Sequence, residues 1–122
     1  MKKSFLLMIG FILLAITACE YKYIEPVVIE LPPDEVVSFG EQVEPIFQEK
    51  CISCHANISP VLTTGNAYNN LINGNLVDTA APESSVIYVK TNTEGHPGGN
   101  NTLNATELAL ILKWIKEGAQ DN

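Results

Sequence analysis

A short cysteine and histidine motif constrains this chain more than any other feature. Residues 50–56 read KCISCHA, so Cys51, Cys54 and His55 form a C-x-x-C-H pattern, which is typical of covalent haem attachment. Residues three apart share one side of a helical turn, so both sulfurs can bond to one haem while the adjacent histidine binds its iron. We therefore expect one haem c per chain, with thioether bonds to both cysteines and His55 as the proximal iron ligand.

Two other chemistries also use paired cysteines, and both fit this sequence less well. A thioredoxin-type dithiol is expected in a framework of alternating strands and helices, which the sequence does not show. A structural zinc site needs four ligands, and the one remaining histidine, His96, cannot supply a second ligand pair. Haem remains the best explanation of the motif.

The N-terminus has the layout of a secretory signal peptide. Within residues 1–18, Lys2 and Lys3 precede an apolar stretch, and small residues stand before Cys19. The apolar stretch is short for a membrane span, and the ending ITAC resembles the lipobox of bacterial lipoproteins. We expect lipidation of Cys19, which would anchor an exported haem domain to a bacterial membrane, in the periplasm or at the cell surface. An ordinary signal peptide followed by a chance cysteine is the alternative.

The charge balance bears on possible partners. Loss of residues 1–18 would leave five lysines against fourteen acidic residues. Such a chain repels nucleic acid and anionic headgroups and favours partners with basic patches. We expect no nucleic-acid binding, and membrane contact through the lipid only. Solubility of a small exported domain would explain the acidic residues equally well.

The 122 residues leave room for one small domain. Residues 19–37 mix acids with prolines, which predicts a stiff, extended tether; a short edge strand over 27–29 is the alternative. The haem domain is predicted over residues 38–122. Ser38 and Glu41 have the spacing of a capping box at its start, and Pro45 then either kinks this helix or begins a fresh turn.

Amphipathic patterns predict three further features. Val43, Ile46 and Phe47 form an apolar stripe that could cover the last helix. That last helix is the clearest: Asn104 and Glu107 can form its capping box. Leu103 can pack on Leu108 as a hydrophobic staple at its start. Its buried face is predicted to consist of Leu108, Ile111, Leu112 and Ile115, with Trp114 beside that face. We expect the helix to end at Gly118. Residues 66–73 predict a short helix ended by Gly74.

With these segments, the chain resembles the small bacterial monohaem cytochromes c. The matching segments are VEPIFQEKCISCH at 43–55, SVIYVK at 85–90, GHPGG at 95–99 and LNATELALILKWIKEGAQDN at 103–122. The resemblance implies an all-α, cytochrome c-like bundle of about four short helices around a covalently bound haem, with the N- and C-terminal helices crossing. It also favours a helix at 85–90, where β-branched residues favour a strand and the preceding proline and acid favour a helix.

The loop before the last helix is where many of these cytochromes place the sixth iron ligand. The common ligand is methionine, but both methionines, Met1 and Met8, lie in the signal peptide. His96 stands in the family's position, in EGHPGG, so we expect it to be the sixth ligand. Glycines and Pro97 beside it would allow close approach to the haem and limit the freedom lost on binding. A surface histidine in an ordinary turn is the alternative, and lysine, an amine or water could replace it as ligand.

The resemblance implies an electron carrier with no catalytic residues, which exchanges single electrons with redox partner proteins. Two histidine ligands would give a comparatively low reduction potential, and we expect a carbonyl near Pro60 to accept the Nδ1 proton of His55. An open-sided haem acting as peroxidase or small-ligand sensor is one alternative, although the chain lacks the arginine that often assists peroxide cleavage. A haem subunit of a larger redox complex is another.

Overall fold

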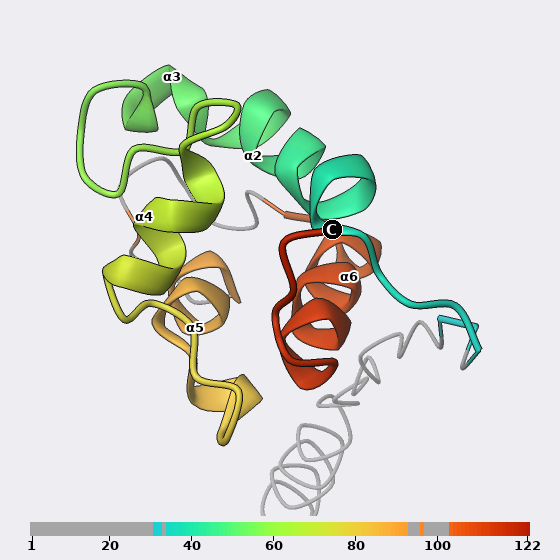
Figure 1. Ribbon diagram of the computed structural model, residues 1–122. Helices are drawn as coiled ribbons and strands as arrows, with labels where there is room; N and C mark the ends of the chain where they lie inside the picture. Colours follow the sequence, from blue (N-terminus) through green and yellow to red (C-terminus); the bar gives the residue numbers. More distant parts are fainter. Residues whose placement is uncertain (1–30, 33, 93–95, 97–102) are drawn as a thin grey trace, which may run out of the picture.

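The regular structure of the described residues consists of five short α-helices, one π-helical segment and one 3₁₀ turn. The computed structural model describes residues 31–32, 34–92, 96 and 103–122, and these contain no strand (Figure 1). In chain order the elements are η2 (Phe39–Val43), α2 (Glu44–Lys50), α3 (Ile52–His55), α4 (Ala67–Asn73), η3 (Pro82–Ser84), α5 (Val86–Asn92) and α6 (Ala105–Lys116). The all-α prediction is confirmed, including a helix rather than a strand after residue 85.

The predicted signal peptide, Cys19 and the alternative strand at 27–29 lie outside the described residues, as does most of the tether. Within the described part, no helix has both the length and the apolar character needed to cross a membrane.

The first helical segment begins at Ser38, as the sequence predicts. Its Oγ accepts a hydrogen bond from the backbone N–H of Glu41 at 3.2 Å. The return bond comes from one residue later than expected, because the backbone N–H of Ser38 donates to Oε1 of Gln42 at 2.9 Å. Pro45 lies in the first turn of α2, where a missing N–H costs no helical hydrogen bond. Of the two predicted roles for this proline, the fresh turn is correct.

The last helix, α6, has both predicted ends. Asn104 Oδ1 accepts from the N–H of Glu107 at 2.9 Å, and the Glu107 carboxylate accepts from the N–H of Asn104 at 2.7 Å, which completes the capping box. At the other end Gly118 has φ +98°, a conformation that glycine adopts without strain. The N–H groups of Gly118 and Ala119 bond back to the carbonyls of Ile115 and Trp114 and so close the helix.

The buried face of α6 is centred on Trp114, whereas the sequence pattern placed Trp114 at the side of that face. Ile111, Trp114 and Ile115 are fully buried, whereas Leu108 and Leu112 are half-buried. The large indole ring accounts for this rotation, because it lies 5.1 Å from the ring of Phe39 and 6.3 Å from that of Tyr68, measured between centroids. The centre of the core is therefore an aromatic cluster, which the predicted leucine and isoleucine stripe did not include.

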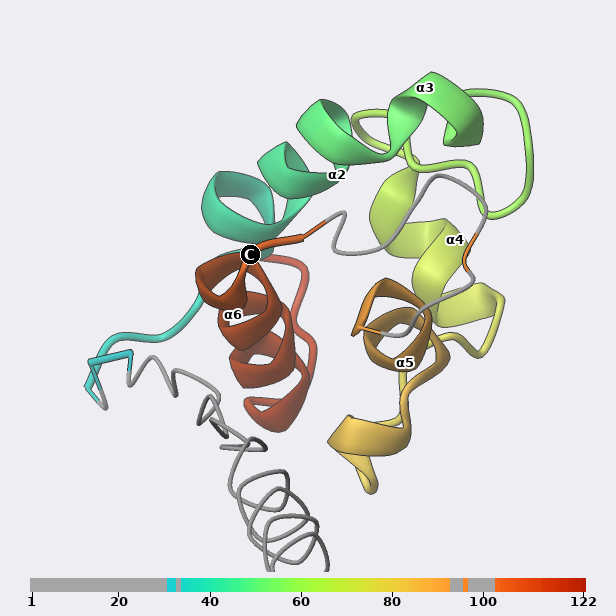
Figure 2. The same ribbon diagram turned by 180° about the vertical axis from the view of Figure 1, so that it is seen from behind.

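The arrangement of the helices brings the first and last helical segments of the described residues together. In both views η2, α2 and α3 follow one another in an arc over one end of the molecule, with α6 below η2 and with α4 and α5 on the other side (Figures 1 and 2). The N-terminal segment η2 contacts α6, which in turn contacts α5. The predicted contact between the first and last helices is therefore present.

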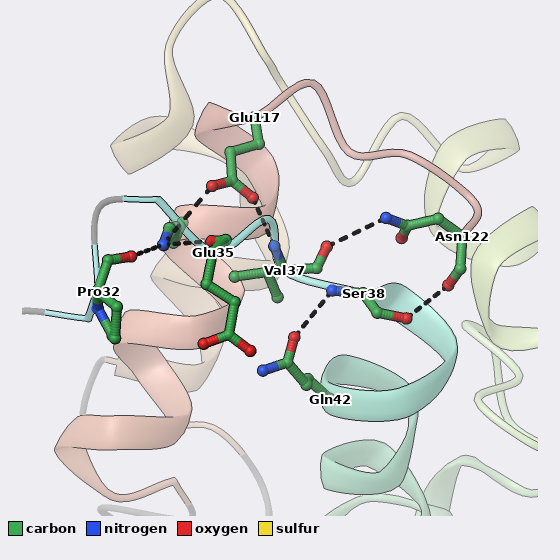
Figure 3. A network of polar contacts seen from close by, with 8 residues as sticks. Pro32, Glu35, Val37, Ser38, Gln42, Glu117 and Asn122 are labelled. Atoms are coloured by element: carbon green, nitrogen blue, oxygen red, sulfur yellow. Dashed lines mark hydrogen bonds and ion pairs between the residues drawn. The ribbon is translucent and has the colours of Figure 1, made fainter.

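A network of polar contacts fastens the chain before η2 to α6 (Figure 3). We call residues 32 and 34–38 the N-terminal strap. Lys113 Nζ donates to the backbone carbonyls of Pro32 and Glu35. Glu117 accepts from the N–H of Val37 at 2.8 Å, and the Val37 side chain is buried. Hydrogen bonds thus hold the strap on α6, and Val37 is its one buried residue.

Candidate haem site

The turn formed by α3 carries all three residues of the C-x-x-C-H motif. Cys51 ends α2 and caps α3, and its carbonyl accepts from the N–H groups of Cys54 at 3.2 Å and His55 at 2.9 Å. Cys51 is half-buried and packs against the core, Cys54 is exposed, and both thiols are free. One helical turn therefore presents two thiols and an imidazole together, as the spacing predicts.

The loop after α3 fixes the orientation of the His55 ring. Its Nδ1 lies 2.9 Å from the carbonyl oxygen of Pro60 and 3.3 Å from that of Ile58. Because a carbonyl can only accept a hydrogen bond, Nδ1 carries a proton, and in the neutral ring Nε2 then keeps a lone pair that can bind a metal ion. The predicted contact near Pro60 is confirmed, and a bond from the N–H of Leu62 to the His55 carbonyl, 2.9 Å, holds the loop against α3.

The ring of His96 lies close to that of His55, although 41 positions separate them in the sequence. Their ring centroids are 6.0 Å apart and their planes differ by 25°. A histidine nitrogen binds a metal ion at about 2 Å, and in a five-membered ring with bonds of about 1.3 Å that nitrogen lies about 1.1 Å from the centroid. Two imidazoles that bind one ion from opposite sides therefore have centroids about 6.2 Å apart. The separation of the two ring centroids therefore matches that of a pair of axial ligands.

A bound group such as haem would complete a ligand set around the two histidines. Within residues 31–32, 34–92, 96 and 103–122, no cluster of three or more histidine, cysteine or acidic side chains could hold a metal ion. Burial, with smaller contributions from Glu107 and Cys54, raises the pKa of the Cys51 thiol to about 11. A thiol that stays neutral at pH 7 is a poor nucleophile for disulfide exchange. A haem, which supplies four in-plane nitrogens, fits this donor set.

One charged group near the cysteines was not predicted as part of the site. Glu107 Oε1 lies 3.9 Å from Nζ of Lys50, the residue before Cys51, and its side chain is only 15% exposed. The Lys50 ammonium also contacts Glu49 at 2.9 Å. The hydrogen bond that Lys50 donates to Glu49, together with the charges of both acids, raises the pKa of Lys50. The sequence marked Glu107 only as a helix cap, because nothing in the spacing connects it to a residue 57 positions earlier.

Of the predicted site residues, Cys51, Cys54, His55 and His96 are therefore brought together, and Cys19 lies outside the described residues. Comparisons with known proteins add no further assignment: no family model matches the chain, and no curated protein or solved structure is significantly similar to it. The chemistry of the site is accordingly inferred from its own residues.

Proposed function

We propose that this protein is a c-type cytochrome that carries single electrons while anchored to a membrane by its N-terminal lipid. The observation that carries the proposal is the pair of imidazoles of His55 and His96, whose ring centroids are 6.0 Å apart beside a turn with two free thiols. That spacing suits two axial ligands on one iron. The C-x-x-C-H order supplies the covalent attachment.

In this proposal each residue has a defined role. Cys51 and Cys54 form the two thioether bonds, His55 is the proximal ligand and His96 is the sixth ligand. The bound haem would supply an iron that takes up and releases one electron without a bond being made or broken. The Pro60 carbonyl orients His55 through the 2.9 Å contact with Nδ1. With both axial positions filled by protein, no position is left for substrate.

The partners follow from the charge. An acidic domain would exchange electrons with redox proteins that present basic patches, through a small and transient contact. Export and lipidation at Cys19 would place the domain in the periplasm or at the cell surface. Permanent membership in a larger redox complex would leave the same chemistry in place.

Spectra of the ferric protein test the axial ligands. The full chain, produced in a host that attaches haem c, is compared with His96→Ala by electronic and EPR spectroscopy. We expect the wild type to be low-spin and His96→Ala to be high-spin, because the variant loses one strong-field nitrogen ligand. The matched variant His96→Met restores a ligand of the type common in other cytochromes c, and we expect it to be low-spin with a more positive potential.

Two outcomes would contradict the proposal. If the ferric wild type is already high-spin and the reduced protein binds CO readily, the haem is open-sided, and a peroxidase or sensor replaces the electron carrier. If no haem remains on the chain after denaturation, and Cys51→Ser or Cys54→Ser changes nothing, covalent attachment itself is wrong.

A further inference from the structure

Glu107 is a partly buried carboxylate whose two oxygens make different contacts. One oxygen, Oε2, accepts from the N–H of Asn104 at 2.7 Å and caps α6. The other oxygen, Oε1, lies 3.9 Å from Nζ of Lys50. The helix cap uses only one of the two oxygens, so the other oxygen of the charged group faces the residue before Cys51.

The charge of this carboxylate is only partly neutralised. Its single cationic neighbour among the described residues, Lys50, is shared with Glu49, which lies closer at 2.9 Å. Glu49 is 72% exposed, whereas Glu107 is 15% exposed. Solvent and salt screen an exposed charge strongly and a buried one weakly. Glu107 therefore has the longer electrostatic reach toward the cysteines, and it is among the groups that disfavour a negative charge on Cys51.

We propose that Glu107 lowers the reduction potential of a haem attached at Cys51 and Cys54, and that the positive charge of Lys50 partly offsets this effect. The inference rests on the proposed function. In the one-electron reduction, ferric iron gains an electron from a redox partner protein and becomes ferrous, so the site loses one unit of positive charge. A nearby carboxylate favours the ferric state.

The experiment is a spectroelectrochemical titration of the haem-loaded full chain. Glu107→Gln is the test variant, because glutamine at this helical position keeps the capping bond and removes only the charge. We expect its midpoint potential to rise, so that the ferric-to-ferrous ratio at a fixed solution potential falls by about threefold to tenfold. A tenfold fall corresponds to a rise of about 59 mV for one electron. The rise should persist at high salt.

Two further variants test the geometry. Lys50→Met leaves the Glu107 charge unneutralised, so we expect its potential to fall. Glu49→Gln removes an equal charge at the more exposed partner of the same lysine and is the matched control; we expect a smaller shift, which high salt abolishes. Guanidinium denaturation midpoints of all three variants check that the fold is retained. If Glu107 had a purely structural role, its replacement would change the stability and leave the potential unchanged.

The outcomes separate this inference from the proposed function. If haem is attached and low-spin but Glu107→Gln and Glu49→Gln have equal potentials, the role of Glu107 is only that of a helix cap, and this inference is wrong while the electron carrier stands. If Lys50→Met raises the potential, the direction of the effect is wrong. If no haem is attached to the wild type, the proposed function fails first.

Discussion

Asn122 holds the two ends of the described chain together through its side chain and its backbone. Its Oδ1 accepts from the N–H of Phe39 at 2.8 Å, and its backbone oxygen accepts from Ser38 Oγ at 2.8 Å and from the N–H of Gly40 at 2.9 Å. The N–H groups at the start of a helix have no partner within that helix. Asn122 therefore caps η2 from the far end of the sequence.

Replacement of Asn122 by alanine removes the Oδ1 acceptor and leaves the N–H of Phe39, a buried residue, without its partner. We expect Asn122→Ala to lower the free energy of unfolding by about 1 kcal/mol, the usual effect of a lost helix cap. Guanidinium denaturation of the haem-loaded protein measures this. The control Asn122→Asp keeps an acceptor oxygen and should denature near the wild-type midpoint. Equal midpoints for Asn122→Ala and the wild type would show that this cap contributes nothing.

The residues of the site differ in how far the sequence alone could place them. Cys51, Cys54 and His55 lie within one turn, so their grouping follows from local geometry. The contact of His55 with the Pro60 carbonyl is also local. His96 could be assigned only through a resemblance, because no local pattern connects it to His55. The Glu107–Lys50 pair could not be predicted at all, since the tertiary fold alone brings the two together.

At the scale of elements, helix ends were predicted better than helix partners. The caps at Ser38, Asn104 and Gly118 are formed by neighbours in the sequence. The segment at α5 shows the limit of local preference, since its β-branched residues favour a strand. Ser85, buried just before α5, accepts from the N–H of Asp78 at 2.8 Å and donates to its carbonyl. This tertiary contact fixes the start of the helix, and no periodicity could reveal it.

Hydrogen bonds with Lys113 and Glu117 hold the N-terminal strap on α6. Because Lys113 Nζ donates to the carbonyls of Pro32 and Glu35, we expect Lys113→Met to release these residues from α6. Hydrogen exchange of the haem-loaded protein should then show protection falling by about fivefold or more at the N–H of Val37, which Glu117 binds. That loss corresponds to about 1 kcal/mol, the contribution of one hydrogen bond.

The control for the strap is Lys116→Met, on the same helix. Lys116 pairs with Glu83 at 2.7 Å, and both side chains are at least half exposed. This pair lowers the pKa of Glu83, but exposed pairs contribute little to stability. Protection at Val37 should be unchanged in Lys116→Met. If Lys113→Met leaves it unchanged as well, the contacts of Lys113 do not hold the strap.

The molecule as a whole has a small apolar core. The buried cluster is centred on Phe39, Phe47 and Trp114, and Cys51 lies at its border, half-buried. Ile58, in the loop that orients His55, is 63% exposed. A domain of this size buries too little apolar surface to be very stable on its own. In the proposed function the haem would extend this core from the side of Cys51.

The double variant Cys51→Ser with Cys54→Ser, which cannot attach haem, tests this dependence at the scale of the whole molecule. We expect it to lack a sharp thermal transition by circular dichroism, whereas the loaded wild type should unfold cooperatively. The conservative control is His96→Ala, which keeps both thioether bonds and should retain a transition at a lower temperature. A cooperative transition in the double variant would show that the aromatic core folds this chain by itself, with haem added to a finished domain.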